Sequence, residues 1–387
     1  MTISDNVRRL PVAGFVPAVM AEQDDSASAS DDWRWQLQHA VTTAGELKQR
    51  LSLTSAESAG AERAESEGFP ISITPHYLSL VDLEDPGCPI RRQVVPRVEE
   101  ALRSRGDLED PLGEEAHSPA PELVQRYPDR ALLLVNDRCS VYCRFCTRSR
   151  MVGSGGGARS MDKLRPAFEY LERTEAVRDV IVSGGDPLVM STGKLARIIE
   201  RLRSIPSVET IRLATRVPVT LPQRITDELL LALKPHHPLW LMTHFNHPKE
   251  LNKASIRALN LLADNGFPVM NQSVLLRGVN DDAATLSELF RGLVRQRARP
   301  YYLLQMDPVN GTGHLRTPFA AGQRIMRELQ GRLSGIALPK FIVDTPGGHG
   351  KVPAESSYVV SQEPGVTVFR SPFGAEVPYL DPQDAAL

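Results

Sequence analysis

The 387-residue sequence has few cysteines, no excess of one charge and no long apolar run. Four cysteines are too few for a secreted disulfide scaffold, which carries many in a short chain. The net charge of −2 gives no basic field, so we expect neither nucleic acid nor a membrane as partner. The apolar runs at 132–135 and 239–242 are far below the ~20 residues that cross a bilayer, and residues 1–20 lack a signal-peptide core. These absences favour a cytoplasmic protein.

The composition is otherwise that of a globular protein. Hydrophobic residues make up 41% of the chain, which excludes a wholly disordered or fibrous protein. At the usual size of domains, this length allows one large domain or two to three small ones.

The N-terminal third differs from the rest of the chain in composition and in the spacing of its apolar residues. Residues 22–32 form a Ser/Ala/Asp run, and residues 54–68 are rich in Ala, Glu and Ser. Neither has the apolar periodicity of a packed element, although the second could form an exposed helix. Between them, residues 33–53 place apolar side chains at helical spacing. We therefore expect residues 1–125 to form a mainly helical, partly flexible extension.

From residue 130 onward, short runs rich in Leu, Val and Ile alternate with amphipathic segments, for the most part at intervals of about 30 residues. The runs are 131–135, 180–183, 210–215, 239–243, 269–275, 301–305 and 341–343. This alternation predicts βαβ units and a parallel sheet. Six or seven consecutive units without a marked reversal favour a partial (β/α)6-type barrel over an open sheet. We assign residues 126–345 to this α/β barrel and residues 346–387 to a short C-terminal segment.

The first predicted strand is followed by three closely spaced cysteines, Cys139, Cys143 and Cys146. Three thiolates on one loop suit a [4Fe–4S] cluster that has no fourth protein ligand and so leaves one iron open. The alternative is a zinc site completed by Cys88 or a histidine, but such sites usually have a second pair of ligands, which is missing here. Cys88 itself is expected to be a buried structural thiol.

Polar residues follow the predicted strand ends, which in a barrel form the active face. The second strand ends in Ser-Gly184-Gly185-Asp186-Pro, where glycines allow close approach of the backbone. Taken alone, Gly-Gly-Asp is also an ordinary turn. Later strand ends carry Thr215-Arg216, Thr243-His244, Asp307 and Asp344.

A second motif, Asp-Thr-Pro-Gly-Gly-His-Gly-Lys, occupies residues 344–351. It is not a Walker A loop, because Thr345 and Val352 stand where that loop needs Gly and Ser/Thr. A lysine on a Gly-rich loop beyond a strand can form an imine with an aldehyde cofactor. Lys351 is the candidate, although most such lysines are simply solvated.

The cysteine motif, with Phe145 before its last cysteine, resembles the radical S-adenosylmethionine (radical SAM) superfamily. The resemblance implies that S-adenosylmethionine binds the open iron and that one-electron reduction releases a 5′-deoxyadenosyl radical. It also implies that Phe145, Gly184, Gly185 and Asp186 lie at the S-adenosylmethionine site.

The motif at 344–351 closely resembles the pyridoxal-phosphate segment of the lysine 2,3-aminomutase family, and the resemblance extends over residues 77–369. It implies that Lys351 binds pyridoxal phosphate covalently. Arg126 and Arg130 would bind its phosphate, although without the family they would be read as surface charges.

Three further residues take roles from the same resemblance. Arg148 would bind the α-carboxylate of the substrate, unless it is a cation that tunes the cluster. His244 and Gln272 would lie near S-adenosylmethionine, although a histidine at such a place can equally be a structural donor.

In the lysine-specific enzymes of this family two carboxylates bind the side-chain ammonium of the substrate, and they match Asp307 and Asp344. Two anions at neighbouring strand ends repel each other unless a cation joins them. Either residue singly could instead be a helix cap or an ion-pair partner. The pair favours a cationic side chain over a neutral or acidic one.

The resemblance therefore implies a cytoplasmic isomerase that converts L-lysine to L-β-lysine with a [4Fe–4S] cluster, S-adenosylmethionine and pyridoxal phosphate. A one-electron donor such as flavodoxin or ferredoxin and a homo-oligomeric state are also expected. The alternatives are an arginine or glutamate 2,3-aminomutase, a relative that modifies a protein, and a non-enzymatic metal-binding module. No cysteine follows Cys146, so the zinc between subunits of clostridial family members is not expected.

Overall fold

The protein is built around one nine-stranded sheet whose strands lie in chain order, from β1 to β9. The structure is a computed structural model and describes residues 29–153 and 155–382. Strands β2 to β8 are parallel, whereas β1 and β9 pair antiparallel at the two edges. Because the order never reverses, the prediction of a partial α/β barrel is confirmed and a doubly wound sheet is excluded.

The strands of the sheet are β1 (Leu123–Tyr127), β2 (Arg130–Asn136), β3 (Asp179–Gly184), β4 (Thr210–Ala214), β5 (Leu239–Thr243), β6 (Val269–Leu275), β7 (Ala298–Gln305), β8 (Lys340–Thr345) and β9 (Gly350–Pro353). The seven predicted runs fall on β2 to β8. The helices between them are α5 (Met161–Arg173), α6 (Thr192–Arg203), α7 (Val217–Thr220), α8 (Asp227–Leu233), α9 (Lys253–Asp264), α10 (Ala283–Arg295) and α11 (Phe319–Leu329).

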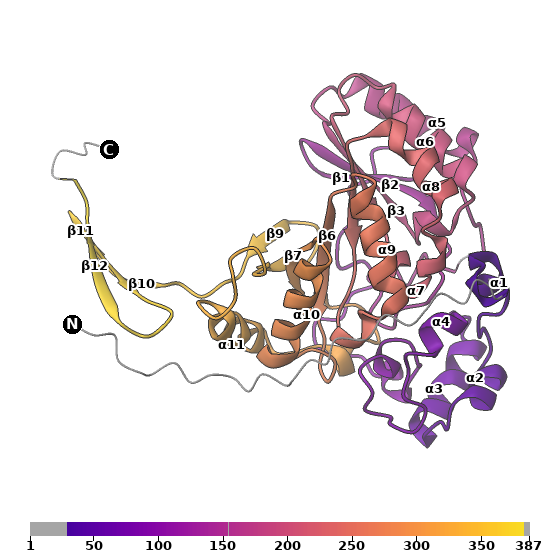
Figure 1. Ribbon diagram of the computed structural model, residues 1–387, viewed down its shortest axis with the longest axis horizontal. Coiled ribbons are helices and arrows are strands. Elements are labelled where there is room, and N and C mark those ends of the chain that lie inside the picture. The colour runs from indigo at the N-terminus through magenta and orange to yellow at the C-terminus, as the bar shows by residue number, and fades with distance from the viewer. Residues whose placement is uncertain (1–28, 154, 383–387) are drawn as a thin grey trace.

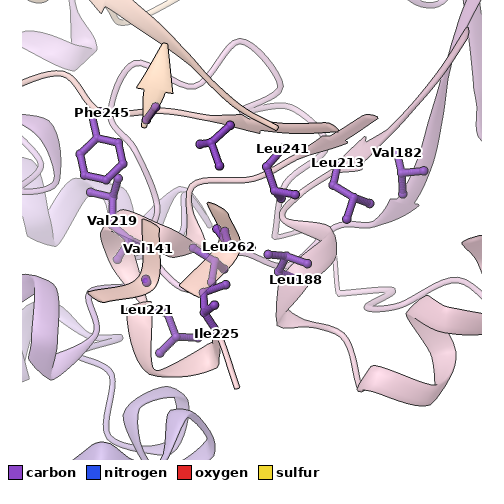
Figure 2. Close-up of a cluster of buried hydrophobic side chains, with 14 of the residues drawn as sticks. Val141, Val182, Leu188, Leu213, Val219, Leu221, Ile225, Leu241, Phe245 and Leu262 are labelled. Atoms are coloured by element: carbon purple, nitrogen blue, oxygen red, sulfur yellow. The ribbon is translucent and has the colours of Figure 1, made fainter. Parts of the chain in front are cut away.

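The main core lies between the outer face of the sheet and these helices. Val182 of β3, Leu213 of β4 and Leu241 of β5 belong to one buried cluster with Leu262 of α9 (Figure 2). Val141, which lies between the first two cysteines of the motif, is part of the same cluster. The core that holds the strands therefore also anchors the cysteine loop.

The N-terminal extension contains α1 (Trp33–Gln38), α2 (Ala44–Arg50), α3 (Ser55–Ser66) and α4 (Pro75–Leu78), and residues 1–28 lie outside the described part. The prediction of helical structure, including a helix within 54–68, is confirmed, but α3 is exposed on one face only. Gly60 and Ala61 of α3 are buried, and a Cβ at Gly60 would meet the backbone of Arg97 at 2.4 Å. Small residues permit this contact, so the low hydrophobicity of the helix did not reveal its burial.

A separate antiparallel sheet of β10 (Val359–Glu363), β11 (Val366–Arg370) and β12 (Glu376–Leu380) extends away from the barrel (Figure 1). Every residue of β10 and β12 is exposed. Within the described ranges, no helix has the length and apolarity needed to span a membrane.

The end of β3 provides a test of how tightly the barrel holds its first loop. A Cβ at Gly185 would lie 2.4 Å from the backbone oxygen of Arg138, so Gly185→Ala forces one of the two segments to move. We expect it to lower the free energy of urea unfolding by about 1–3 kcal/mol. Gly193→Ala is the matched control, since its Cβ meets nothing within 4 Å and alanine favours its helix. Equal stability of the two variants would contradict this packing.

Candidate active site

The cysteine loop after β2 is held on one side by the N-terminal extension. The backbone N–H of Tyr142 donates to Ser72 O at 2.8 Å, and that of Arg144 donates to Gln93 O at 2.9 Å. The Arg144 side chain is buried and forms an ion pair with Glu100. The extension is thus part of the site's framework.

On its other side the loop is held by the Gly-Gly-Asp turn after β3. Gly185 N donates to Asn136 O at 2.6 Å, and a Cβ at Gly184 would lie 2.1 Å from the same oxygen. The Asp186 carboxylate accepts hydrogen bonds from Thr215 Oγ1 and Arg216 N, both at 2.7 Å. Its burial raises the pKa above the ordinary value. These three residues were predicted to contact S-adenosylmethionine, and here they bond to the protein itself and fix the loop.

The three thiols of the motif are free, and burial disfavours the thiolate form of Cys139 and Cys146. Burial, with the charge of Asp186 second, raises the pKa of Cys139, and burial raises that of Cys146 to about 11. Bound iron supplies the positive charge that converts such thiols to thiolate ligands. In the described ranges, no three His, Cys, Asp or Glu side chains converge as the ligands of a single metal ion do. Three cysteines on one loop are the donor set that a [4Fe–4S] cluster with one open iron requires.

Arg216, at the end of β4, contacts this motif directly. Its Nη1 lies 2.7 Å from Cys143 Sγ, and its Nη2 lies 2.8 Å from Glu250 Oε1. From the sequence, Arg216 was recognised only as a polar residue at a strand end, with no role. Its position in the chain, one strand after the Gly-Gly-Asp turn, was the signal that could have identified it.

Phe145 and His244 lie together beside the cysteine motif. Their rings meet edge to face, with centroids 5.5 Å apart. His244 Nε2 is buried without a hydrogen-bond partner in the described structure. Burial, with the charge of Arg216 second, lowers the histidine pKa to about 3, so the ring is neutral. A buried unpaired nitrogen fits a polar group of a bound cofactor.

Gln272 belongs to the inward row of β6. Its neighbours Asn271 and Ser273 face the other way, where both side chains bond to the backbone of Phe245. Side chains alternate along a strand, so Gln272 projects into the barrel. The predicted S-adenosylmethionine residues His244, directly after β5, and Gln272, within β6, thus come from adjacent strands.

Arg148, two residues beyond the motif, is paired with an acidic residue that the sequence did not single out. Its guanidinium lies 2.8 Å from Glu114 Oε1, and the Glu114 side chain is only 4% exposed. Arg148 Nη1 also lies 3.4 Å from Ser183 Oγ. Arg148, which was predicted to bind a substrate carboxylate, is therefore already paired with the carboxylate of Glu114.

The centre of the site is the buried carboxylate of Asp344. Arg126 donates to both of its oxygens, at 3.0 and 3.2 Å, and the Lys351 ammonium forms an ion pair with it. Lys351 reaches it because Asp344 of β8 and Lys351 of β9 are cross-strand partners. Burial opposes ionisation of Asp344, but Arg126 and Lys351 outweigh it and hold the pKa below its ordinary value.

Asp307 follows β7, the neighbour of β8. Burial raises its pKa to about 7, and the charge of Asp344 adds to this effect. Two carboxylates and two cations, Arg126 and Lys351, therefore share this end of the barrel. Lys351 and Arg126 fit a phosphorylated aldehyde cofactor. In place of their contacts with Asp344, the Lys351 amine could bond to the carbonyl carbon of the cofactor, and the Arg126 guanidinium could bind its phosphate.

The second arginine predicted for the phosphate, Arg130, lies further out. It pairs with Asp129 at 3.0 Å and stacks over the Tyr127 ring at 4.4 Å. The Tyr127 hydroxyl accepts a hydrogen bond from Lys351 N at 2.8 Å. Arg130 is thus linked to the Lys351 segment through Tyr127.

The raised pKa of Asp307 predicts a pH dependence of stability without ligands. Because the folded protein keeps the Asp307 proton up to about pH 7, while the ordinary pKa is 3.8, stability falls as pH rises through this window. Asp307→Asn should remove up to about 4 kcal/mol of this decline. Unfolding free energies measured between pH 4 and 8 test it, with the exposed Asp227→Asn as control. Parallel curves for both variants and the parent would contradict the assignment.

The chain resembles known proteins over most of its length. Residues 133–289 match the model of the radical SAM superfamily, and residues 326–386 match that of lysine-2,3-aminomutase. An L-lysine 2,3-aminomutase of Fusobacterium nucleatum is 47% identical over 92% of this chain and 83% of its own. That of Clostridium subterminale is 47% identical over 93% and 86%. A glutamate 2,3-aminomutase of Clostridioides difficile is 39% identical over 88% and 81%.

Proposed function

Because the chain belongs to the lysine 2,3-aminomutase family of radical SAM enzymes, we propose that it moves the α-amino group of L-lysine to C3 and so forms L-β-lysine. The enzyme is an isomerase that uses a [4Fe–4S] cluster, S-adenosylmethionine and pyridoxal phosphate. When bound, the first two supply a carbon-centred radical, and the third carries the migrating nitrogen. The protein itself binds and orients the substrate and shields the reacting groups from water.

One observation carries the choice of lysine. The Asp344 carboxylate binds the ε-ammonium of Lys351, and this group is chemically the same as the side-chain ammonium of the substrate. If Lys351 and Arg126 hold the cofactor, Asp344 loses both cations while Asp307 stays beside it. A substrate ammonium restores the charge balance that the buried pair requires.

A glutamate side chain would do the opposite, because it would bring a third carboxylate to Asp307 and Asp344. Unpaired like charges in a desolvated site cost far more than a lost methylene contact. This argument favours lysine over glutamate, although the glutamate enzyme is also a relative.

At the other end of the substrate, Arg148 is proposed to take the α-carboxylate. Glu114 now fills that place, so binding exchanges one carboxylate for another and leaves no unpaired arginine. Arg148 follows β2, whereas Asp344 lies within β8. Gripping both ends of the substrate fixes C2 and C3 between them.

Turnover of individual amino acids tests this function. The purified chain, given iron, sulfide, reductant, S-adenosylmethionine and pyridoxal phosphate, should convert L-lysine to L-β-lysine in preference to arginine or glutamate. Lys351→Ala should lose both bound pyridoxal absorbance and turnover. Preferred conversion of arginine or glutamate would contradict the assignment of lysine as the substrate.

The acidic pair gives a sharper form of that prediction. Asp307→Asn should lower kcat/KM for lysine at least about 30-fold, since losing one partner of a buried charge pair costs 2–5 kcal/mol. Its iron and pyridoxal contents should stay at parent level, because Asp307 has no proposed role with either. A change in kcat/KM below threefold would show that Asp307 does not bind the substrate.

The electron that starts the reaction is proposed to come from flavodoxin or ferredoxin, since radical SAM chemistry needs a one-electron donor. We propose a cytoplasmic location on the same ground, because three cluster thiolates and their reductant require reducing conditions.

A homo-oligomer is proposed from the sheet of β10 to β12. Phe373, Tyr379 and Leu380 are 76%, 61% and 72% exposed, and such a projecting apolar surface is typical of an interface. A second copy would cover it. A chain that ends at residue 356 should elute as a monomer in size-exclusion chromatography with light scattering, whereas the full chain should not. A monomeric full chain at micromolar concentration would exclude this role.

A further inference from the structure

Arg216 is a buried cation in direct contact with one of the proposed cluster ligands. Its side chain is 8% exposed, and Nη1 donates to Cys143 Sγ at 2.7 Å. Its Nε donates to the backbone oxygen of His244 at 3.2 Å. The guanidinium therefore bridges the cysteine loop and the end of β5, within a fully enclosed setting.

Three fully buried residues hold the rest of the guanidinium. Nη2 donates to Gln93 Oε1 at 2.6 Å, Glu250 Oε1 at 2.8 Å and Tyr77 Oη at 3.0 Å. Tyr77, Gln93 and Glu250 each have 0% exposure. The rings of Tyr77 and Phe145 flank it, each 5.3 Å from the guanidinium carbon.

A buried ion pair is a costly way to hold two segments together, because apolar side chains would do so at least as well. What a guanidinium adds is a positive charge and a hydrogen bond at a sulfur. Hydrogen bonds to ligand sulfurs and nearby charge set the potentials of iron–sulfur clusters, and both act strongly where water is excluded.

We propose that Arg216 raises the reduction potential of the cluster by donating to the Cys143 thiolate, and that Glu250 limits this effect by opposing the charge of Arg216. One electron from the donor takes the cluster from the 2+ to the 1+ state, and Arg216 stabilises the added negative charge. Arg216 is a positioning and tuning residue here, since it acts through Cys143. The inference rests on the proposed cluster at the three cysteines and is independent of which amino acid is the substrate.

The test is a mediated redox titration of the reconstituted full chain without S-adenosylmethionine, followed by the EPR signal of the reduced cluster. In Arg216→Gln the ratio of reduced to oxidised cluster at a fixed potential should fall at least tenfold, a shift of 59 mV for one electron. Glu250→Gln should shift the potential in the opposite direction. Arg216→Lys, which keeps the charge, should lie between parent and Arg216→Gln.

Arg91→Gln is the matched control, because Arg91 is also fully buried and paired with a buried glutamate, Glu57, at 2.7 Å. It contacts no cysteine of the motif and should leave the ratio within threefold of the parent. Iron and sulfide contents are measured for every variant, so that loss of the cluster is distinguished from a shift in its potential.

The proposal is overturned if the ratio of reduced to oxidised cluster stays within threefold of the parent value in both Arg216→Gln and Glu250→Gln. It is also overturned if the two variants shift the potential in the same direction. If Arg216→Gln retains no iron, Glu250→Gln decides alone, since it keeps Arg216: a rise supports the proposal and an unchanged potential refutes it. A parent chain that binds no iron would instead contradict the cluster itself.

Discussion

Two carboxylates cannot be buried side by side unless cations accompany them, and this constraint governs the mouth of the barrel. Asp344 and Asp307 come from adjacent strands, and Arg126 and Lys351 neutralise Asp344. The same two cations are the groups proposed to hold pyridoxal phosphate. The site therefore balances its charge internally, and binding of cofactor and substrate replaces one set of ion pairs by another.

The segments after β2 and β4 follow a similar rule, because each holds a cation that a carboxylate neutralises. Arg148 is paired with Glu114 and Arg216 with Glu250. In each pair the carboxylate fixes the orientation of the guanidinium, which can still bind a further partner. That partner is proposed to be the substrate carboxylate for Arg148 and a cluster sulfur for Arg216. The near-zero net charge of the chain thus conceals a site with strong local fields of both signs.

Much of the barrel could be predicted from the sequence because buried parallel strands have a strong apolar signal, as at 180–183 and 239–243. Other elements could not. β9 carries Lys351 yet reads as a Gly-rich loop, and its pairing with β8 depends on a tight turn through Gly347 and Gly348, both at positive φ. Ion pairs such as Arg126–Asp344 join residues 218 positions apart, a distance at which no local pattern operates. The roles of the site residues stay predictions.

The central claim is that nitrogen moves from C2 to C3 of lysine while the side-chain amine stays bound to the acidic pair. L-Lysine labelled with ¹⁵N only at the α-amino group, turned over by the reconstituted enzyme and examined by NMR, tests this directly. The account predicts β-lysine with the label on C3 and none on the side-chain nitrogen. β-Lysine whose C3 nitrogen carries no label, or label that appears on the side-chain nitrogen, would contradict it.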